Sequence, residues 1–286
     1  MNLWLTLAVN SVALGGVLFL LSSGFSLIFG LMRIPNLMHG SFFMLGAYLG
    51  VTFLEKGLNF WVAAFASGAA MAVIGGVIER TLLRRLAGQD LPQVLLTLGL
   101  SFIVADLCLI RWGGDPIQPP TPAQLQGAVQ VFGIFFPIYR LAILGIAVVI
   151  AAGLWFMIDR TRLGAMIRAG VDDPQMARVV GIRVSELFTI VFGLGAALAG
   201  FAGVIGGPIL SVYPGLDQDM LPLALVVVIL GGSGSLIGSF VGSFVVGVLY
   251  NFGQALVPEF AYVVLFLPML VVLVVRPAGL FGRPTS

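Results

Sequence analysis

The chain has 286 residues and a formal net charge of +2; hydrophobic residues make up 59% of it and charged residues only 9%. A soluble globular domain carries about 25% charged residues, so this composition excludes an ordinary soluble fold. The small net charge also gives no reason to expect a nucleic-acid partner.

Long uncharged runs follow one another along the chain. Six of them have at least 18 residues: Leu3–Met32, Ile34–Leu54, Gly57–Ile78, Leu141–Ile158, Leu187–Leu216 and Met220–Pro258. Because about 20 apolar residues cross a bilayer, these runs predict membrane spans. With two shorter apolar runs included, we expect segments at 5–31, 37–54, 60–79, 93–111, 140–158, 186–207, 220–230, 236–256 and 260–275. The chain is therefore predicted to be one all-α, polytopic transmembrane domain over residues 1–286, surrounded by lipid.

The basic residues are distributed unevenly between the predicted loops. If Arg33 lies in the cytoplasm, eleven of the fourteen basic residues lie on that side: Arg33, Arg80, Arg84, Arg85, Arg160, Arg162, Arg168, Arg178, Arg183, Arg276 and Arg283. The positive-inside rule predicts this asymmetry. We therefore expect a multi-pass protein of a bacterial inner membrane, with the N-terminus outside and the C-terminus in the cytoplasm.

One predicted span is too short. Met220–Leu230 would rise only about 16 Å as a helix, roughly half the hydrocarbon thickness. A glycine- and serine-rich run over 231–235 follows it and tolerates irregular backbone. Such backbone survives at membrane depth only against protein or a water-filled cavity. We expect a broken helix or half-helix here, and eight or nine membrane segments in total.

The residue types that most enzymes need are scarce. Lys56 is the only lysine and follows Glu55, so the chain has no P-loop with which to bind ATP. His39 is the only histidine and Cys108 the only cysteine, which excludes the common zinc motifs and most histidine-based catalytic pairs. We expect no catalytic site, metal or cofactor in this chain, and a role in transport.

The predicted cytoplasmic segment 159–186 carries helix-capping signals. Asp173 suits an N-cap, Pro174 suits the first helical position, and Gly181 can end a helix in the left-handed conformation. The pattern predicts a helix of about seven residues between two spans. Its apolar positions, Met176, Ala177, Val179, Val180 and Ile182, would suit a groove on a partner protein. The alternative is a basic loop that only fixes the topology.

Three motifs resemble LivH-type branched-chain amino-acid permeases. The first is Thr161-x-x-Gly164-x-x-x-Arg168-Ala169 followed by Asp172, Ala177 and Gly181-Ile182, which is similar to the coupling segment of that family. The second is the Ala/Gly-rich stretch 192–204, and the third is the N-terminal stretch 24–48. The resemblance covers nearly the whole chain and is weakest across the predicted outer loop 112–139.

The resemblance implies a permease subunit of an ABC importer. A second, LivM-like permease would pair with it, LivG- and LivF-like subunits would bind ATP and Mg, and a periplasmic binding protein would deliver the solute. The residues that would couple to the ATPases are Gly164, Arg168, Ala169, Asp173, Pro174, Ala177 and Gly181. Branched-chain or related amino acids are the expected solutes; urea, amides and aromatic carboxylates are alternatives within the class. A stand-alone channel or secondary transporter, active without ATP, is the alternative from another class.

Small polar residues near two predicted helix starts are candidates for the solute pathway. They are Asn36, His39 and Ser41 near the second span, and Ser235 and Ser239 after the expected broken helix. The first group would otherwise satisfy helix ends. The second group would otherwise belong to a small-residue packing stripe. Asp217 and Asp219 are expected in an outer loop, where a binding protein or a solvated turn would explain them equally well.

Overall fold

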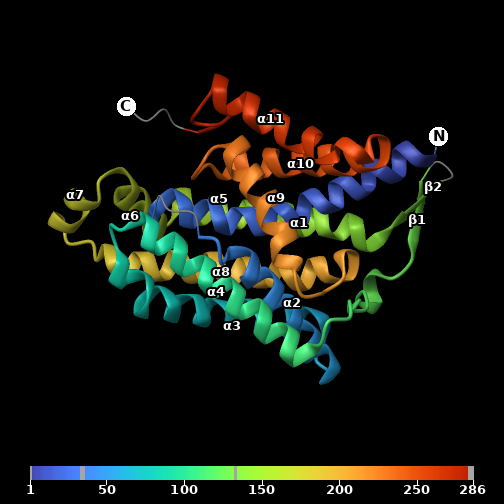
Figure 1. Cartoon of the computed structure of the whole chain (residues 1–286), viewed down its shortest axis with the longest axis horizontal. Coiled ribbons are helices and arrows are strands. Elements are labelled where there is room, and N and C mark those ends of the chain that lie inside the picture. Colours follow the sequence, from blue (N-terminus) through green and yellow to red (C-terminus); the bar gives the residue numbers. More distant parts are fainter. Residues whose placement is uncertain (1, 33–35, 132–133, 283–286) are drawn as a thin grey trace.

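The computed structural model describes residues 2–32, 36–131 and 134–282, and it forms an elongated helical bundle (Figure 1). The helices are α1 (Asn2–Met32), α2 (His39–Glu55), α3 (Phe60–Thr81), α4 (Asp90–Trp112), α5 (Ile138–Arg160), α6 (Arg162–Asp172), α7 (Pro174–Val179), α8 (Val184–Leu210), α9 (Leu216–Gly231), α10 (Leu236–Leu256) and α11 (Ala261–Val275). Short 3-10 turns are η1 (Leu83–Leu86), η2 (Ala123–Leu125) and η3 (Pro258–Phe260). Two antiparallel strands, β1 (Ala128–Val131) and β2 (Ile134–Pro137), pair with Val129 opposite Phe136.

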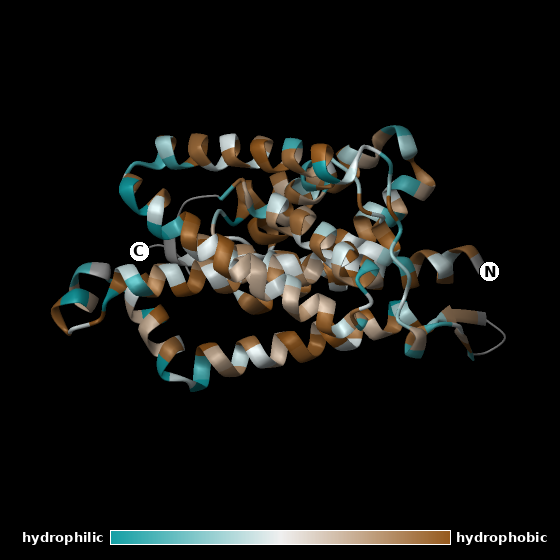
Figure 2. Ribbon diagram, turned by 90° about the horizontal axis from the view of Figure 1, so that it is seen from below, coloured by the Kyte–Doolittle hydropathy of each residue, from teal (hydrophilic) through white to brown (hydrophobic). Residues whose placement is uncertain are grey.

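Every predicted membrane segment falls on a helix, but the expected count of eight or nine spans is slightly off. Among the described residues, seven helices are long and apolar enough to cross a membrane: α1, α3, α4, α5, α8, α10 and α11. The two others are short. α2 has 17 residues and α9 has 16, which correspond to about 25 Å of helix, less than the roughly 30 Å of hydrocarbon. Hydrophilic segments gather at the two ends of the bundle (Figure 2).

The two short helices begin inside the bundle. At the start of α2, the His39 and Ser41 side chains are fully buried, and the Leu37 backbone N–H lies 3.3 Å from the Thr97 hydroxyl of α4. α9 follows Gly215, which has a φ of +105°, and its first residues Leu216 and Asp217 are buried. The predicted segment 37–54 therefore falls on α2, which begins at His39.

Irregular backbone separates α9 from α10, as the sequence predicts. α9 ends at Gly231, and Gly232 and Gly234 adopt φ values of +99° and +75°. This break does not lie halfway along the bundle. The Gly234 N–H donates to the Ser26 hydroxyl at 3.1 Å, which places the break beside the last two turns of α1.

α8 forms the centre of the bundle and packs against α1, α2 and α3. Its glycines permit backbone contact: a Cβ on Gly46 of α2 would lie 2.3 Å from the Cα of Gly200. A Cβ on Gly24 of α1 would lie 2.6 Å from the carbonyl oxygen of Gly195. Small residues at helix interfaces are the usual means of close packing in lipid. The Ala/Gly-rich stretch 192–204 is therefore the packing core of the fold.

This packing predicts a large difference between two glycine substitutions. We expect Gly46→Leu to destabilise the protein by about 1–3 kcal/mol or more, because the added atoms meet backbone that cannot move aside. Gly145→Leu on α5 is the matched control, since nothing lies within 4 Å of a Cβ built there. The measurement is thermal unfolding of the purified protein in detergent. Equal unfolding temperatures for the two variants would contradict the packing argument.

Candidate functional site

The segment between α5 and α8 folds into two short helices rather than one. α7 lies where the sequence predicts a helix: Asp173 Oδ1 accepts hydrogen bonds from the N–H groups of Gln175 and Met176, each at 2.9 Å. Pro174 stands in the first turn, and Gly181 follows the helix with a φ of +88°. α6 is additional, and the Thr161 hydroxyl caps it by accepting from the Gly164 N–H at 3.2 Å.

Gly164 and Arg168 hold α6 against the end of α5. A Cβ on Gly164 would lie 2.0 Å from the Ile158 carbonyl oxygen, so only glycine fits this elbow. Arg168 donates to the same carbonyl and lies 3.7 Å from the Asp159 carboxylate. Ala169 is half-buried beside them. Gly164 and Arg168 thus fix the angle between two helices of this chain.

α7 lies at one end of the bundle, far from the N-terminus and the β1–β2 hairpin (Figure 1). Val179 is 80% exposed there, and Met176 and Val180 are also exposed. Ala177 is only 2% exposed and packs inward, so it does not belong to the surface that a partner would meet. The outward face of α7 is an apolar patch of Met176, Val179 and Val180.

A buried carboxylate joins the neighbouring helix ends. Glu79, 1% exposed near the end of α3, accepts from the Arg84 guanidinium at 3.2 Å and from the Thr189 hydroxyl. The same Arg84 nitrogen donates to the Ser185 carbonyl oxygen at 2.7 Å and to the Thr189 hydroxyl at 2.5 Å. Arg84 belongs to η1, whereas Ser185 and Thr189 belong to α8. The network therefore ties the α3–η1 turn to the start of α8, directly after α7.

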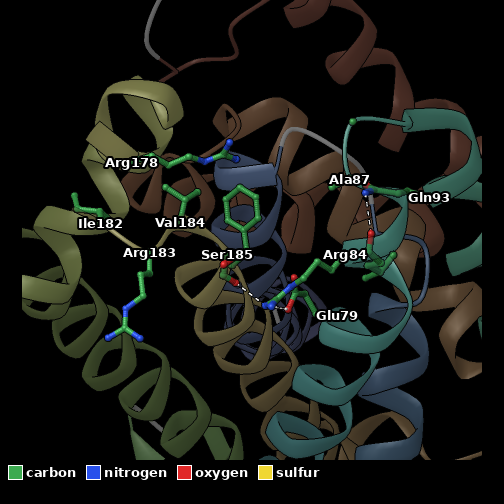
Figure 3. Close-up of a pocket in the computed structure, with 12 residues that line it drawn as sticks. Glu79, Arg84, Ala87, Gln93, Arg178, Ile182, Arg183, Val184 and Ser185 are labelled. Carbon is green, nitrogen blue, oxygen red and sulfur yellow. Dashed lines mark hydrogen bonds and ion pairs between the residues drawn. The ribbon is translucent and has the colours of Figure 1, made fainter. Parts of the chain in front are cut away.

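A cavity of about 490 Å³ opens beside this network (Figure 3). Its walls come from the α3–η1–α4 turns on one side and from the α7–α8 connection on the other; they comprise Glu79, Leu83, Arg84, Ala87, Gly88, Gln93, Arg178, Ile182, Arg183, Val184, Ser185 and Phe188. The Arg178 side chain extends toward the opposite wall, whereas Arg183 points away and pairs with Glu186 at 2.7 Å. Sequence reasoning did not single out this site, although the close spacing of Glu79 and Arg84 at a span end was a visible signal.

The candidate pathway residues near α2 are all enclosed by the chain. Asn36 Oδ1 accepts from the Met38 N–H at 3.1 Å, and His39 Nε2 donates to the Leu21 carbonyl oxygen at 2.9 Å. Ser41 donates to Asp217 Oδ2 at 3.0 Å. Asp217 is only 5% exposed, so the solvated turn considered for it is wrong. This bond joins the buried starts of α2 and α9.

Ser235 and Ser239 lie elsewhere, at the start of α10. The Ser235 hydroxyl accepts from the Gly238 N–H at 3.0 Å and so caps the helix. Ser239 is fully buried one turn further on. The structure therefore places the five candidate pathway residues in two separate groups.

Asp219 also has a local partner, because the Tyr213 hydroxyl donates to it. Tyr213 belongs to the connection between α8 and α9. Burial, together with the hydrogen bond to Asp219, raises the pKa of Tyr213 above its ordinary range.

A tightly packed bundle, in whose described part seven helices are long and apolar enough to cross a membrane, defines this chain as an integral-membrane protein. A family model described as the permease component of branched-chain amino acid transport systems matches residues 7–273, and the chain belongs to this family. This confirms the family predicted from the motifs.

Several relatives match along most of the chain. It is 29% identical to the high-affinity branched-chain amino acid transport system permease protein BraD of Pseudomonas aeruginosa, over 96% of this chain and 95% of BraD. It is 26% identical to LivH of Escherichia coli K12, over 96% of this chain and 94% of LivH. It is also 26% identical to the ribose import permease protein RbsC of the same organism, over 85% of this chain and 74% of RbsC. These relatives are permease proteins and not enzymes, as the sequence predicts. No solved structure matches the chain.

The Glu79–Arg84 network predicts a measurable coupling energy. In a double-mutant cycle of Glu79→Gln and Arg84→Gln, we expect about 1–3 kcal/mol of interaction free energy, because the carboxylate is buried and one guanidinium is partly exposed. The exposed pair Arg183 and Glu186, with side chains 79% and 56% exposed, is the control and should give less than about 1 kcal/mol. Chemical unfolding of the purified protein measures both cycles. A coupling at Glu79–Arg84 no larger than the control would refute the structural role of the network.

The cap at Ser235 gives a second prediction. Ser235→Ala should lower the free energy of unfolding by about 1 kcal/mol, since the Gly238 N–H loses its acceptor. We expect the KM for solute uptake to stay unchanged. A shift in KM of severalfold without a change in stability would instead place Ser235 on the solute path.

Proposed function

We propose that this chain is a membrane-spanning subunit of an ABC importer, and that it moves branched-chain or related amino acids across the inner membrane using ATP hydrolysed by separate subunits. The observation that carries the proposal is the apolar patch on α7, which a transporter working alone would have no reason to expose to water. The family to which the chain belongs supports the same reading.

The geometry behind α7 is suited to transmitting movement. α7 leads through a short turn into α8, and α8 contacts α1, α2 and α3 at backbone distance through its glycines. A force applied to α7 would therefore reach the centre of the bundle rather than a single loop. The elbow at Gly164 and Arg168 fixes the other end of the segment against α5.

The proposed assembly contains a LivM-like second permease, LivG- and LivF-like ATP-binding subunits that hold ATP and Mg, and a periplasmic substrate-binding protein. The end of the bundle that carries α6 and α7 would face the cytoplasm. Most arginines of the chain belong to elements at this end, in line with the positive-inside rule. The N-terminus lies at the opposite end in Figure 1, so it would face the periplasm.

The similarity to a ribose import permease bears on the choice of solute. Relatives named for amino acids and for a sugar both match this chain over most of its length. The preference for branched-chain or related amino acids therefore rests on the family description and on BraD and LivH.

A charge placed on the α7 patch tests the proposal. Val179→Asp should reduce ATP-dependent uptake at least about tenfold, because docking would bury an unpaired carboxylate. Amounts of the chain in the membrane should not change, since Val179 makes no buried contact within the chain. Ala177 is a poorer probe because it packs inside the bundle.

Val129→Asp in strand β1 is the matched control at the opposite end, where Val129 is also exposed. Purification of each tagged variant in mild detergent, followed by mass spectrometry, would show which subunits remain attached. Wild-type uptake and wild-type retention of the ATP-binding subunits by Val179→Asp would overturn the proposal.

A further inference from the structure

The cavity between η1 and the α7–α8 connection carries an excess of positive charge. Arg84 and Arg178 enter it from opposite walls, and its one acidic lining residue, Glu79, is already bound to Arg84 and Thr189. Within the described part of the chain, Arg84 makes all its hydrogen bonds through one Nη nitrogen and its side chain stays 33% exposed, while Arg178 forms no ion pair. The guanidinium groups of Arg84 and Arg178 thus both have N–H donors left over for an anion in the cavity.

The remaining walls strengthen the attraction for an anion. Leu83, Ile182, Val184 and Phe188 are apolar and reduce the water around any charge that enters. Electrostatic interactions are stronger in such surroundings than in bulk water. Guanidinium groups bind planar anions, carboxylates above all, through paired N–H donors. A carboxylate with a short apolar neighbour matches both the charge and the lining of this cavity.

The position of the cavity indicates where the carboxylate comes from. Arg178 belongs to α7, and its neighbours Met176, Val179 and Val180 form the apolar patch that the proposed function assigns to an ATP-binding subunit. The cavity and the patch therefore lie at the same end of the bundle, on different sides of α7. A protein that docks on the patch would meet the cavity past the side of α7 that carries Arg178.

We propose that an acidic side chain of the ATP-binding subunit enters this cavity and binds between Arg178 and Arg84 when α7 docks. This inference rests on the proposed function, and it adds a second point of attachment. The acidic side chain would hold the α7–α8 connection and the α3–η1 turn together, because Arg178 belongs to the first and Arg84 to the second. Movement of the ATP-binding subunit would then act on α3 as well as on α8.

Site-specific photo-cross-linking in cells that produce the whole transporter tests this arrangement. p-Benzoylphenylalanine would replace Ala87, which is exposed and lines the cavity on the wall away from α7. We expect an adduct with the co-expressed ATP-binding subunit, mapped by mass spectrometry to a peptide that contains Asp or Glu. Arg85, exposed on the same turn but outside the cavity, is the control and should give at least about fivefold less adduct.

A third probe at Val179 separates the two proposals. Adducts from Val179 but not from Ala87 would overturn the cavity inference and leave the docking of α7 intact. An absence of adducts with the ATP-binding subunit from both positions would overturn the proposed function as well. An adduct of Ala87 with phospholipid alone would show that a lipid headgroup occupies the cavity, which also overturns the inference.

Charge reversal gives an independent readout. Arg178→Glu should lower the amount of ATP-binding subunit retained during purification about tenfold or more, because it sets like charges against each other at the cavity mouth. Arg162→Glu on α6 is the matched control, exposed and outside the cavity lining, and should retain the wild-type amount. Equal retention by the two variants would overturn the proposal.

Discussion

The close approach of α8 to three other helices is the constraint on which the rest of the structure depends. Lipid gives apolar helices little reason to associate, because its tails are as apolar as their side chains. Packing at backbone distance therefore has to supply the association. Gly195 and Gly200 of α8 meet Gly24 of α1 and Gly46 of α2 with no space for a methyl group. Helices in such contact shift together, so the position of α8 sets the positions of α1, α2 and α3.

The end of α8 next to α7 is where another protein could reach this rigid core. A buried carboxylate such as Glu79 is costly at the edge of a membrane unless it is fully paired. Here its partners come from η1 and α8, so the free energy of pairing depends on the relative position of α3 and α8. The network thus favours one arrangement of the two helix ends. α7, capped by Asp173, is joined to α8 immediately before this network.

The sequence predicted those features that depend on local pattern. Six long uncharged runs and two shorter apolar runs identified every membrane helix, and the Asp173–Pro174–Gly181 pattern located α7, because composition and capping act within a few residues. The burial of Asp217 could not be found in this way, since it depends on Ser41, which lies 176 positions away in the sequence.

The burial of the polar residues near α2 also bears on where a solute passes. A solute can be selected only by atoms that it touches, and His39, Ser41 and Ser239 are fully enclosed by the chain's own atoms. His39 and Ser41 hold helix ends in place through their hydrogen bonds, and Ser239 does so through packing alone. In the proposed assembly, solute would then be selected by side chains on the outer faces of the bundle, against a second permease subunit. A core that keeps its shape, with outer faces that vary, would account for relatives of this chain that are named for amino acids and for a sugar.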